Sequence, residues 1–140
     1  MAGYSSTPLA QKLGIRAGCR VGLIDAPTGF EGLLEGLPEG VEIERAPRGR
    51  GHDVLVFFAR EKRVLERRFA ALARRLDVDG GLWVAWPKKS SGVATDLSDG
   101  EVRRIGLEGG LVDNKTCAVD ETWSGLRFVV RLADRPRRKA

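Results

Sequence analysis

Residues Val54-Leu55-Val56-Phe57-Phe58-Ala59 form the longest apolar run of the chain. Apolar side chains at every position are typical of a strand that is buried on both faces. A second run of the same kind, LWVAW, occupies residues 82–86. Between the two runs, residues 61–76 place apolar side chains four, three and four positions apart, which predicts an amphipathic helix whose apolar face ends at Leu76. The order strand, helix, strand predicts a parallel sheet covered by helices.

Further elements on both sides of this unit extend the pattern. Ser98 followed by Glu101 is a capping box, so a helix begins there. Further strands are expected at residues 20–26, 41–45, 116–120 and 126–132, and short helices at residues 7–13 and 30–34. The last two strands are joined by a short turn, which predicts an antiparallel hairpin. The whole pattern predicts an α/β, three-layer, Rossmann-like domain with a mostly parallel sheet of about six strands and a C-terminal antiparallel hairpin.

The length and composition of the chain limit its function class. The 140 residues are enough for one domain, which we expect over residues 1–133, followed by a basic flexible tail over residues 134–140. No apolar run is long enough to cross a bilayer, and no secretory signal is visible. One histidine and two cysteines exclude a zinc site of ordinary type and a disulfide scaffold. These features predict a cytoplasmic protein with reduced thiols, no metal and no membrane partner.

The basic residues are concentrated in two places. The formal net charge is +5, but residues 60–76 alone carry +5 and residues 134–140 carry +3, so the remainder is acidic. A basic stripe containing Arg63, Arg67 and Arg74, together with the basic tail, is one signature of a nucleic-acid accessory protein, which we keep as an alternative. No aromatic residue is interleaved with the stripe for base stacking, and this favours a solvated helix face.

One segment carries a resemblance to a known family. Residues 13–25 (LGIRAGCRVGLID) resemble the approach to the first strand of class I S-adenosylmethionine-dependent methyltransferases. The resemblance implies a final strand reversed and inserted beside residues 82–86. It also implies a cofactor site formed by Asp25, Thr28, Gly29 and Glu44. Residues 3–9, 86–89 and 120–125 are similar, in addition, to a small bacterial family of unknown function, and that similarity covers nearly the whole chain.

Two departures from the methyltransferase pattern predict a reduced relative. The loop after the first strand reads DAPTGF at residues 25–30, where Pro27 offers no amide and only Gly29 is conformationally permissive. Few residues separate the strand at 41–45 from Val54, so one strand and one helix of the usual fold are missing. We therefore predict no cofactor, with S-adenosylmethionine as the alternative.

The candidate site follows from the sheet, because ligands of open α/β sheets bind beyond the carboxyl ends of the strands. Besides the four residues above, the predicted ligand-binding residues there are Arg60, Lys88, Lys89, Ser90, Asp120, Glu121 and Trp123. His52 precedes its strand and so lies at the opposite edge, which leaves no partner for a nucleophile, and no catalytic residue is predicted.

These observations favour an uncharacterised small Rossmann-like protein that binds a small molecule or a protein partner at the strand-end crevice without catalysis. A minimal S-adenosylmethionine-dependent methyltransferase is the first alternative, and the nucleic-acid accessory protein is the second.

Overall fold

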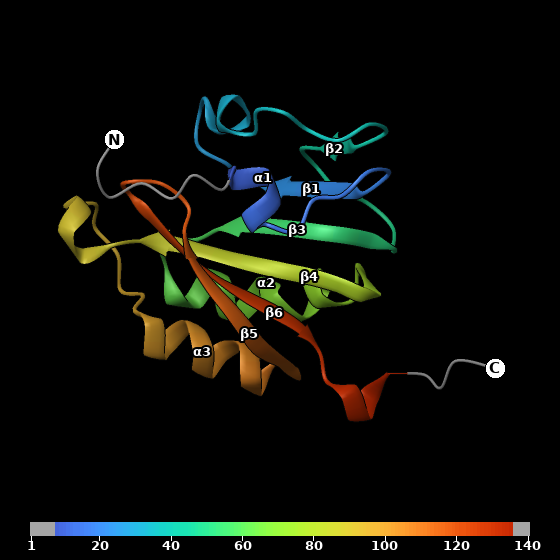
Figure 1. The fold of residues 1–140 in the computed structure, drawn as a ribbon. Helices are drawn as coiled ribbons and strands as arrows, with labels where there is room; N and C mark the ends of the chain where they lie inside the picture. The colour runs from blue at the N-terminus through green and yellow to red at the C-terminus, as the bar shows by residue number, and fades with distance from the viewer. Residues whose placement is uncertain (1–7, 136–140) are drawn as a thin grey trace.

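The computed structural model describes residues 8–135 and contains one sheet of six strands (Figure 1). The strands are β1 (Arg20–Ile24), β2 (Glu42–Glu44), β3 (His52–Phe58), β4 (Leu76–Pro87), β5 (Leu111–Ala118) and β6 (Trp123–Val130). They lie in the order β2-β1-β3-β4-β6-β5, parallel from β2 to β4, with β6 antiparallel to both β4 and β5. The predicted α/β sheet and its reversed last strand beside β4 are confirmed.

Helical segments cover both faces of the sheet (Figure 1). Helices α2 (Lys62–Ala73) and α3 (Asp99–Glu108) pack on one face, and α1 (Leu9–Lys12) and the 3-10 turn η1 (Phe30–Leu33) pack on the other. The side chains of β3 alternate between these two layers, since Leu55 and Phe57 face α2 while Val54, Val56 and Phe58 face α1. The apolar run of β3 is thus buried on both faces, as its sequence predicts.

The helix predicted over residues 61–76 ends earlier, and the prediction for Leu76 is wrong. Helix α2 stops at Ala73, and Leu76 is the first residue of β4, opposite His52 of β3. Gly80 and Gly81 lie inside β4 and not in a turn. A Cβ at Gly80 would lie 2.7 Å from the His52 carbonyl oxygen, so glycine here permits the close approach of the two strands. Leu76 therefore belongs to β4, although its spacing from Leu72 also fits the apolar face of a helix.

The C-terminal half follows the predicted order with shifted boundaries. The Ser98 hydroxyl accepts a hydrogen bond from the Glu101 amide at 3.3 Å, which confirms the predicted cap of α3. Strand β5 begins at Leu111, well before residue 116, so Cys117 lies near its end. Trp123 is the first residue of β6 and does not lie in the turn. Two further 3-10 turns are η2 (Lys89–Ser91) and η3 (Leu132–Asp134).

The connection from β2 to β3 is a loop, residues 45–51, with no helix or further strand in it. It crosses the face of the sheet that α2 covers, and Pro47 packs on Gly22 of β1, where a Cβ would lie 2.8 Å from the Pro47 Cβ. The Arg20 side chain donates to the carbonyls of Arg48 at 2.6 Å and Arg50 at 2.7 Å. The missing strand and helix, predicted from the short spacing, are thus replaced by a loop that is fixed to β1.

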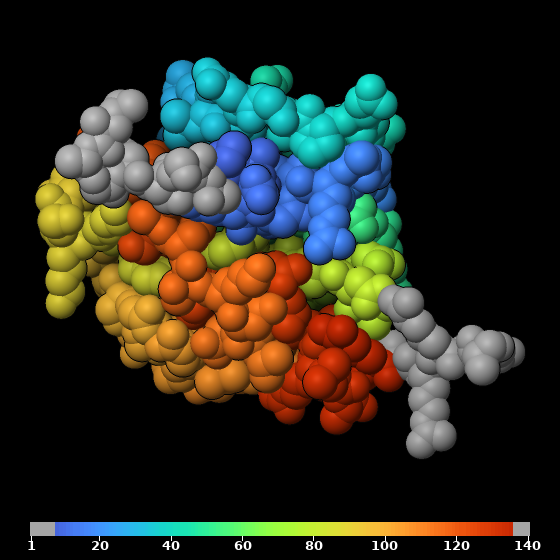
Figure 2. Space-filling view, viewed as in Figure 1, coloured from blue at the N-terminus to red at the C-terminus, as the bar shows by residue number. Residues whose placement is uncertain are grey.

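The carboxyl ends of β1, β3 and β4 share one edge of the sheet, at the left of Figure 1. The segment after β4 that contains η2 protrudes from that edge, in yellow, in the space-filling view (Figure 2). The predicted tail at residues 134–140 lies mostly outside the described residues, so its flexibility stays a prediction.

Candidate functional site

Asp25 directly follows β1 at the carboxyl edge. It is the one non-glycine residue with a positive φ, 56°, among residues 8–135. Aspartate tolerates this left-handed conformation better than most residues, at a cost in strain. Its carboxylate accepts a hydrogen bond from Arg68 Nη1 of α2 at 3.0 Å, and the Arg68 guanidinium lies 5.1 Å from the centre of the Phe57 ring. The exposed Asp25 carboxylate thus links the end of β1 to α2.

A hollow of about 480 Å³, the β1 crevice, lies beside Asp25. It is lined by Leu23, residues 25–31 and Arg45. Thr28 and Gly29 therefore lie together with Asp25, as the sequence predicts. Gly29 has φ 84° and precedes η1, a conformation that suits glycine. In the wall of the crevice, Arg45 Nε donates to the Glu31 carboxylate at 2.6 Å.

Glu44, the fourth predicted cofactor residue, does not line the β1 crevice. Its carboxylate accepts hydrogen bonds from Arg20 Nε at 2.5 Å and Nη2 at 3.2 Å, and it lies 3.2 Å from Nε2 of the fully buried His52. The hydrogen bond from Arg20 is the main reason that the pKa of Glu44 falls to about 2. Glu44 thus connects β2, β1 and β3 and holds a buried histidine at the amino end of the sheet.

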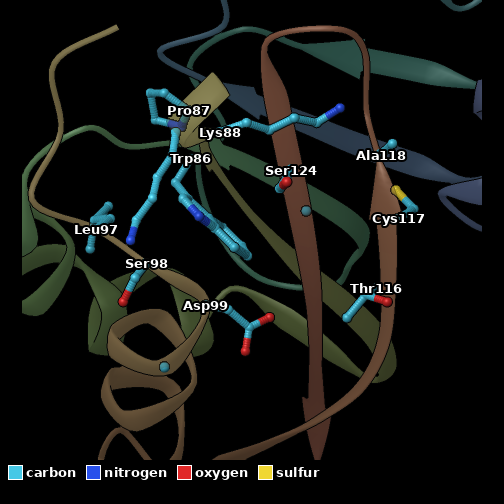
Figure 3. Close-up of a pocket in the computed structure, with 13 residues that line it drawn as sticks. Trp86, Pro87, Lys88, Leu97, Ser98, Asp99, Thr116, Cys117, Ala118 and Ser124 are labelled. Carbon is cyan, nitrogen blue, oxygen red and sulfur yellow. The ribbon is translucent and has the colours of Figure 1, made fainter. Parts of the chain in front are cut away.

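A second and larger hollow, the β4–β6 hollow of about 610 Å³, lies at the carboxyl end of β4 (Figure 3). Lys88 and Lys89 line it together with the start of α3 and the ends of β5 and β6. Figure 3 shows the Trp86 indole between Asp99 on one side and Ser124 on the other. Lys88 Nζ donates to the Asp120 carbonyl at 2.9 Å, so this ammonium is already used to fix the hairpin turn.

The other predicted ligand residues are spread around this edge and do not form one site. The Asp120 carboxylate accepts the amides of Thr122 and Trp123 at 2.8 Å, which shapes the hairpin turn. The Trp123 ring packs edge to face on Phe58, with centroids 5.1 Å apart. Arg60, Ser90 and Glu121 are exposed on separate segments. Of the predicted residues, Asp25, Thr28 and Gly29 line the β1 crevice, Lys88 and Lys89 line the β4–β6 hollow, and the others line neither hollow. The ligand-binding roles stay predictions.

Sequence reasoning missed the arginines beside Asp25. The sequence pattern places Arg68 in a basic helix, Arg45 at the end of the strand expected over residues 41–45, and Arg48 in the loop that follows, and none of these assignments brings the three together. The available signal is the concentration of arginine in residues 45–50 and 60–75, two segments that both follow the first strand in the sequence. Among residues 8–135, no group of three or more His, Cys, Asp or Glu residues is placed to hold a metal ion. Within the same residues, no helix combines the length and apolarity needed to cross a bilayer.

Comparison with known proteins places the fold. No family model matches the chain, and no curated protein matches it. Among solved structures, a SAM-dependent methyltransferase from Aquifex aeolicus is similar with a TM-score of 0.59 and 12% identity over 86% of both chains. The chain has a methyltransferase-like Rossmann fold. A TehB-like SAM-dependent methyltransferase from Corynebacterium glutamicum gives a TM-score of 0.58 at 11% identity, over 93% of this chain and 91% of that one.

A third similar structure belongs to a protein that is not described as a methyltransferase. A possible exported protein from Bordetella parapertussis matches with a TM-score of 0.61 at 13% identity, over 87% of this chain and 65% of that one. At such identities the likeness shows the fold alone. The cytoplasmic location stays a prediction.

The β1 crevice does not fit S-adenosylmethionine in the way that the methyltransferase resemblance implies. The acid assigned to the ribose, Glu44, has its carboxylate occupied by Arg20 and His52. Pro27 lines the crevice and offers no amide. Asp25, Thr28 and Gly29 are the members of the expected set that remain in the crevice.

Proposed function

We propose that this protein binds a nucleoside-containing small molecule in the β1 crevice and does not catalyse a reaction there. The observation that carries the proposal is Asp25, which keeps a strained backbone at the carboxyl end of β1. Such strain is concentrated at functional sites, where the surrounding structure maintains it. The crevice also lies at the carboxyl end of β1, beside Arg45 that follows β2, and ligands of open α/β sheets bind beyond the carboxyl ends of the strands.

The chemistry of the crevice supports binding more than catalysis. Its two carboxylates, Asp25 and Glu31, each accept a hydrogen bond from an arginine. Within the described part of the chain the lining contains no histidine and no cysteine. Leu23, Pro27 and Phe30 provide an apolar wall for a base or a sugar ring.

The test is a thermal-shift panel of adenosine, ADP, NAD, S-adenosylmethionine and S-adenosylhomocysteine on the full chain. A ligand present at 100 times its Kd stabilises the folded state by about 2.7 kcal/mol, which is easily measured. The variant Thr28→Tyr places a larger side chain at an exposed position that lines the crevice. The matched control, Ser90→Tyr, makes a similar change at an exposed position in η2, away from the crevice. We expect stabilisation that is lost in the first variant and kept in the second.

Two results would contradict this proposal. The first is an unchanged unfolding temperature with every compound of the panel. The second is stabilisation that survives Thr28→Tyr but disappears in Ser90→Tyr, which would move the site to the segment beside the β4–β6 hollow.

A further inference from the structure

A groove lined by arginines lies on the α2 side of the sheet, next to Asp25. This arginine groove has a volume of about 470 Å³ and runs between α2 and the loop at residues 45–48. Its charged lining residues are Arg45, Arg48, Arg67, Arg68, Arg75 and Asp25. Five arginines and one aspartate line the groove, which is a net charge of +4, and the Glu31 carboxylate bound to Arg45 lowers the local excess to +3. Like charges held this close repel one another, and an anion between them relieves the repulsion.

Three of these five guanidinium groups are held in place and two are available. Arg45 Nε donates to the Glu31 carboxylate at 2.6 Å. Arg68 is fixed by Asp25, and Arg75 Nη1 donates to the Gly49 carbonyl at 3.0 Å. A guanidinium has five N–H donors, so each of these contacts leaves donors for a ligand. Within residues 8–135, the side chains of Arg48 and Arg67 have no hydrogen-bond or ion-pair partner. The groove therefore combines fixed and available donors for an anion.

The walls of the groove are rigid because the loop is tied at both ends. Arg20 holds the loop carbonyls from the β1 side, and the Gly51 and His52 amides both donate to the Arg75 carbonyl at 2.9 Å. A site that exists before its ligand arrives loses less entropy on binding.

The kind of cation indicates the kind of anion. A smaller hollow of about 250 Å³ continues the groove along α2 and adds Arg50 and Arg74. All seven cations of the two hollows are arginines, although the chain also contains lysines elsewhere. Arginine presents a planar fork that matches the oxygens of a phosphate group, whereas lysine acts as a point charge.

We propose that the arginine groove binds the phosphate groups of a nucleotide whose nucleoside lies in the β1 crevice. This inference rests on the proposed function, because the two hollows share Asp25 and Arg45 in their walls. We place the base in the crevice because Leu23, Pro27 and Phe30 form an apolar wall there. S-adenosylmethionine has no phosphate and carries a sulfonium cation, which the groove repels.

The test is calorimetric titration of the full chain with pyrophosphate and with ADP at low salt. Arg67→Gln removes a groove guanidinium with no partner within residues 8–135, and Arg48→Gln does the same from the loop. Each is expected to weaken binding of both probes roughly tenfold, since each removes charge-assisted hydrogen bonds. The matched control is Arg63→Gln, which makes the same charge change on α2 outside the groove, where Arg63 lies 3.7 Å from Glu61. The control is expected to change binding less than twofold.

The result separates this inference from the proposed function. Adenosine binding that depends on Thr28, with no gain for ADP and no pyrophosphate binding, would refute the groove and keep the crevice. Pyrophosphate binding that depends on Arg67, without any adenosine binding, would keep the groove and refute the crevice. Equal losses in Arg67→Gln and Arg63→Gln would show diffuse attraction and refute the groove. Tighter binding of a mixed-sequence oligonucleotide, with a steep salt dependence, would refute it in favour of a nucleic-acid surface.

Discussion

Replacing Glu44 by alanine tests whether this acid is structural or belongs to a ligand site. The change removes the partner of His52 Nε2, and His52 is fully buried. A buried polar group without a partner costs about 1–3 kcal/mol. The ion pair with Arg20 adds little, about 0.2–1 kcal/mol, because both side chains are close to one-third exposed. We expect Glu44→Ala to lower the free energy of unfolding by about 2 kcal/mol.

The assay is urea denaturation at several pH values, with Glu42→Ala as the control. Glu42 lies on the same strand, is exposed, and should cost less than about 0.5 kcal/mol. Because folding lowers the pKa of Glu44 from 4.5 to about 2, the stabilisation is complete above pH 4.5 and is lost as the pH falls through about 2. The difference between wild type and Glu44→Ala should shrink over that range.

Ligand affinity provides the decisive comparison for Glu44. If the acid is structural, Glu44→Ala leaves the affinity of the folded protein for its ligand unchanged. Equal stability of Glu44→Ala and Glu42→Ala, together with a loss of ligand affinity, would refute the structural role and restore Glu44 to the cofactor set.

Three other changes test the packing, the backbone and the thiol. Gly106→Ala should lower the free energy of unfolding by about 2 kcal/mol, because a methyl group there overlaps the buried Phe128 ring. Gly100→Ala in the same helix meets open space and should raise the free energy of unfolding by up to about 1 kcal/mol. Equal values for the two variants in urea denaturation would contradict the packing of α3 on Phe128. Asp25→Ala should cost about 1 kcal/mol more than Asp25→Asn in the same assay, because asparagine also tolerates φ 56° and alanine does not; equal values would argue against strain. Burial raises the pKa of Cys117, so this thiol should be alkylated more slowly at pH 8 than free cysteine. Mass spectrometry measures the rate in a variant that lacks Cys19. A rate equal to that of free cysteine would place the thiol in solvent.

The sequence predicts the sheet well because its two central strands are continuous apolar runs, at residues 54–59 and 82–86. The apolar run of β3 fits one environment only, a strand buried on both faces. The end of α2 is harder to predict, since Leu76 continues the helical spacing and equally suits the first position of β4. The pairing of Leu76 with His52 decides between them, and this contact joins residues that are far apart in the chain.

The candidate site is less predictable than the fold for a related reason. Position at a strand end is visible in the sequence, and it correctly brings Asp25, Thr28 and Gly29 together. The direction of a side chain depends on its partners, and those of Glu44 lie on two other strands. The periodicity of a three-residue edge strand cannot reveal that its last acid turns toward the amino end of the sheet.

The loop between β2 and β3 connects the position of Glu44 with the proposed arginine groove. In the complete fold that the resemblance implies, a strand and a helix would follow β2, and the acid at its end would face the cofactor. In this chain a short loop, residues 45–51, leads directly from β2 to β3. The Arg20 guanidinium that binds Glu44 also binds two carbonyls of this loop. One arginine thereby binds Glu44 outside the β1 crevice and holds the backbone of Arg48 at the groove. Arg20→Gln should therefore weaken pyrophosphate binding without lying in the groove, and calorimetric titration at equal folded fraction measures this. Unchanged binding would separate the loop anchor from the anion site.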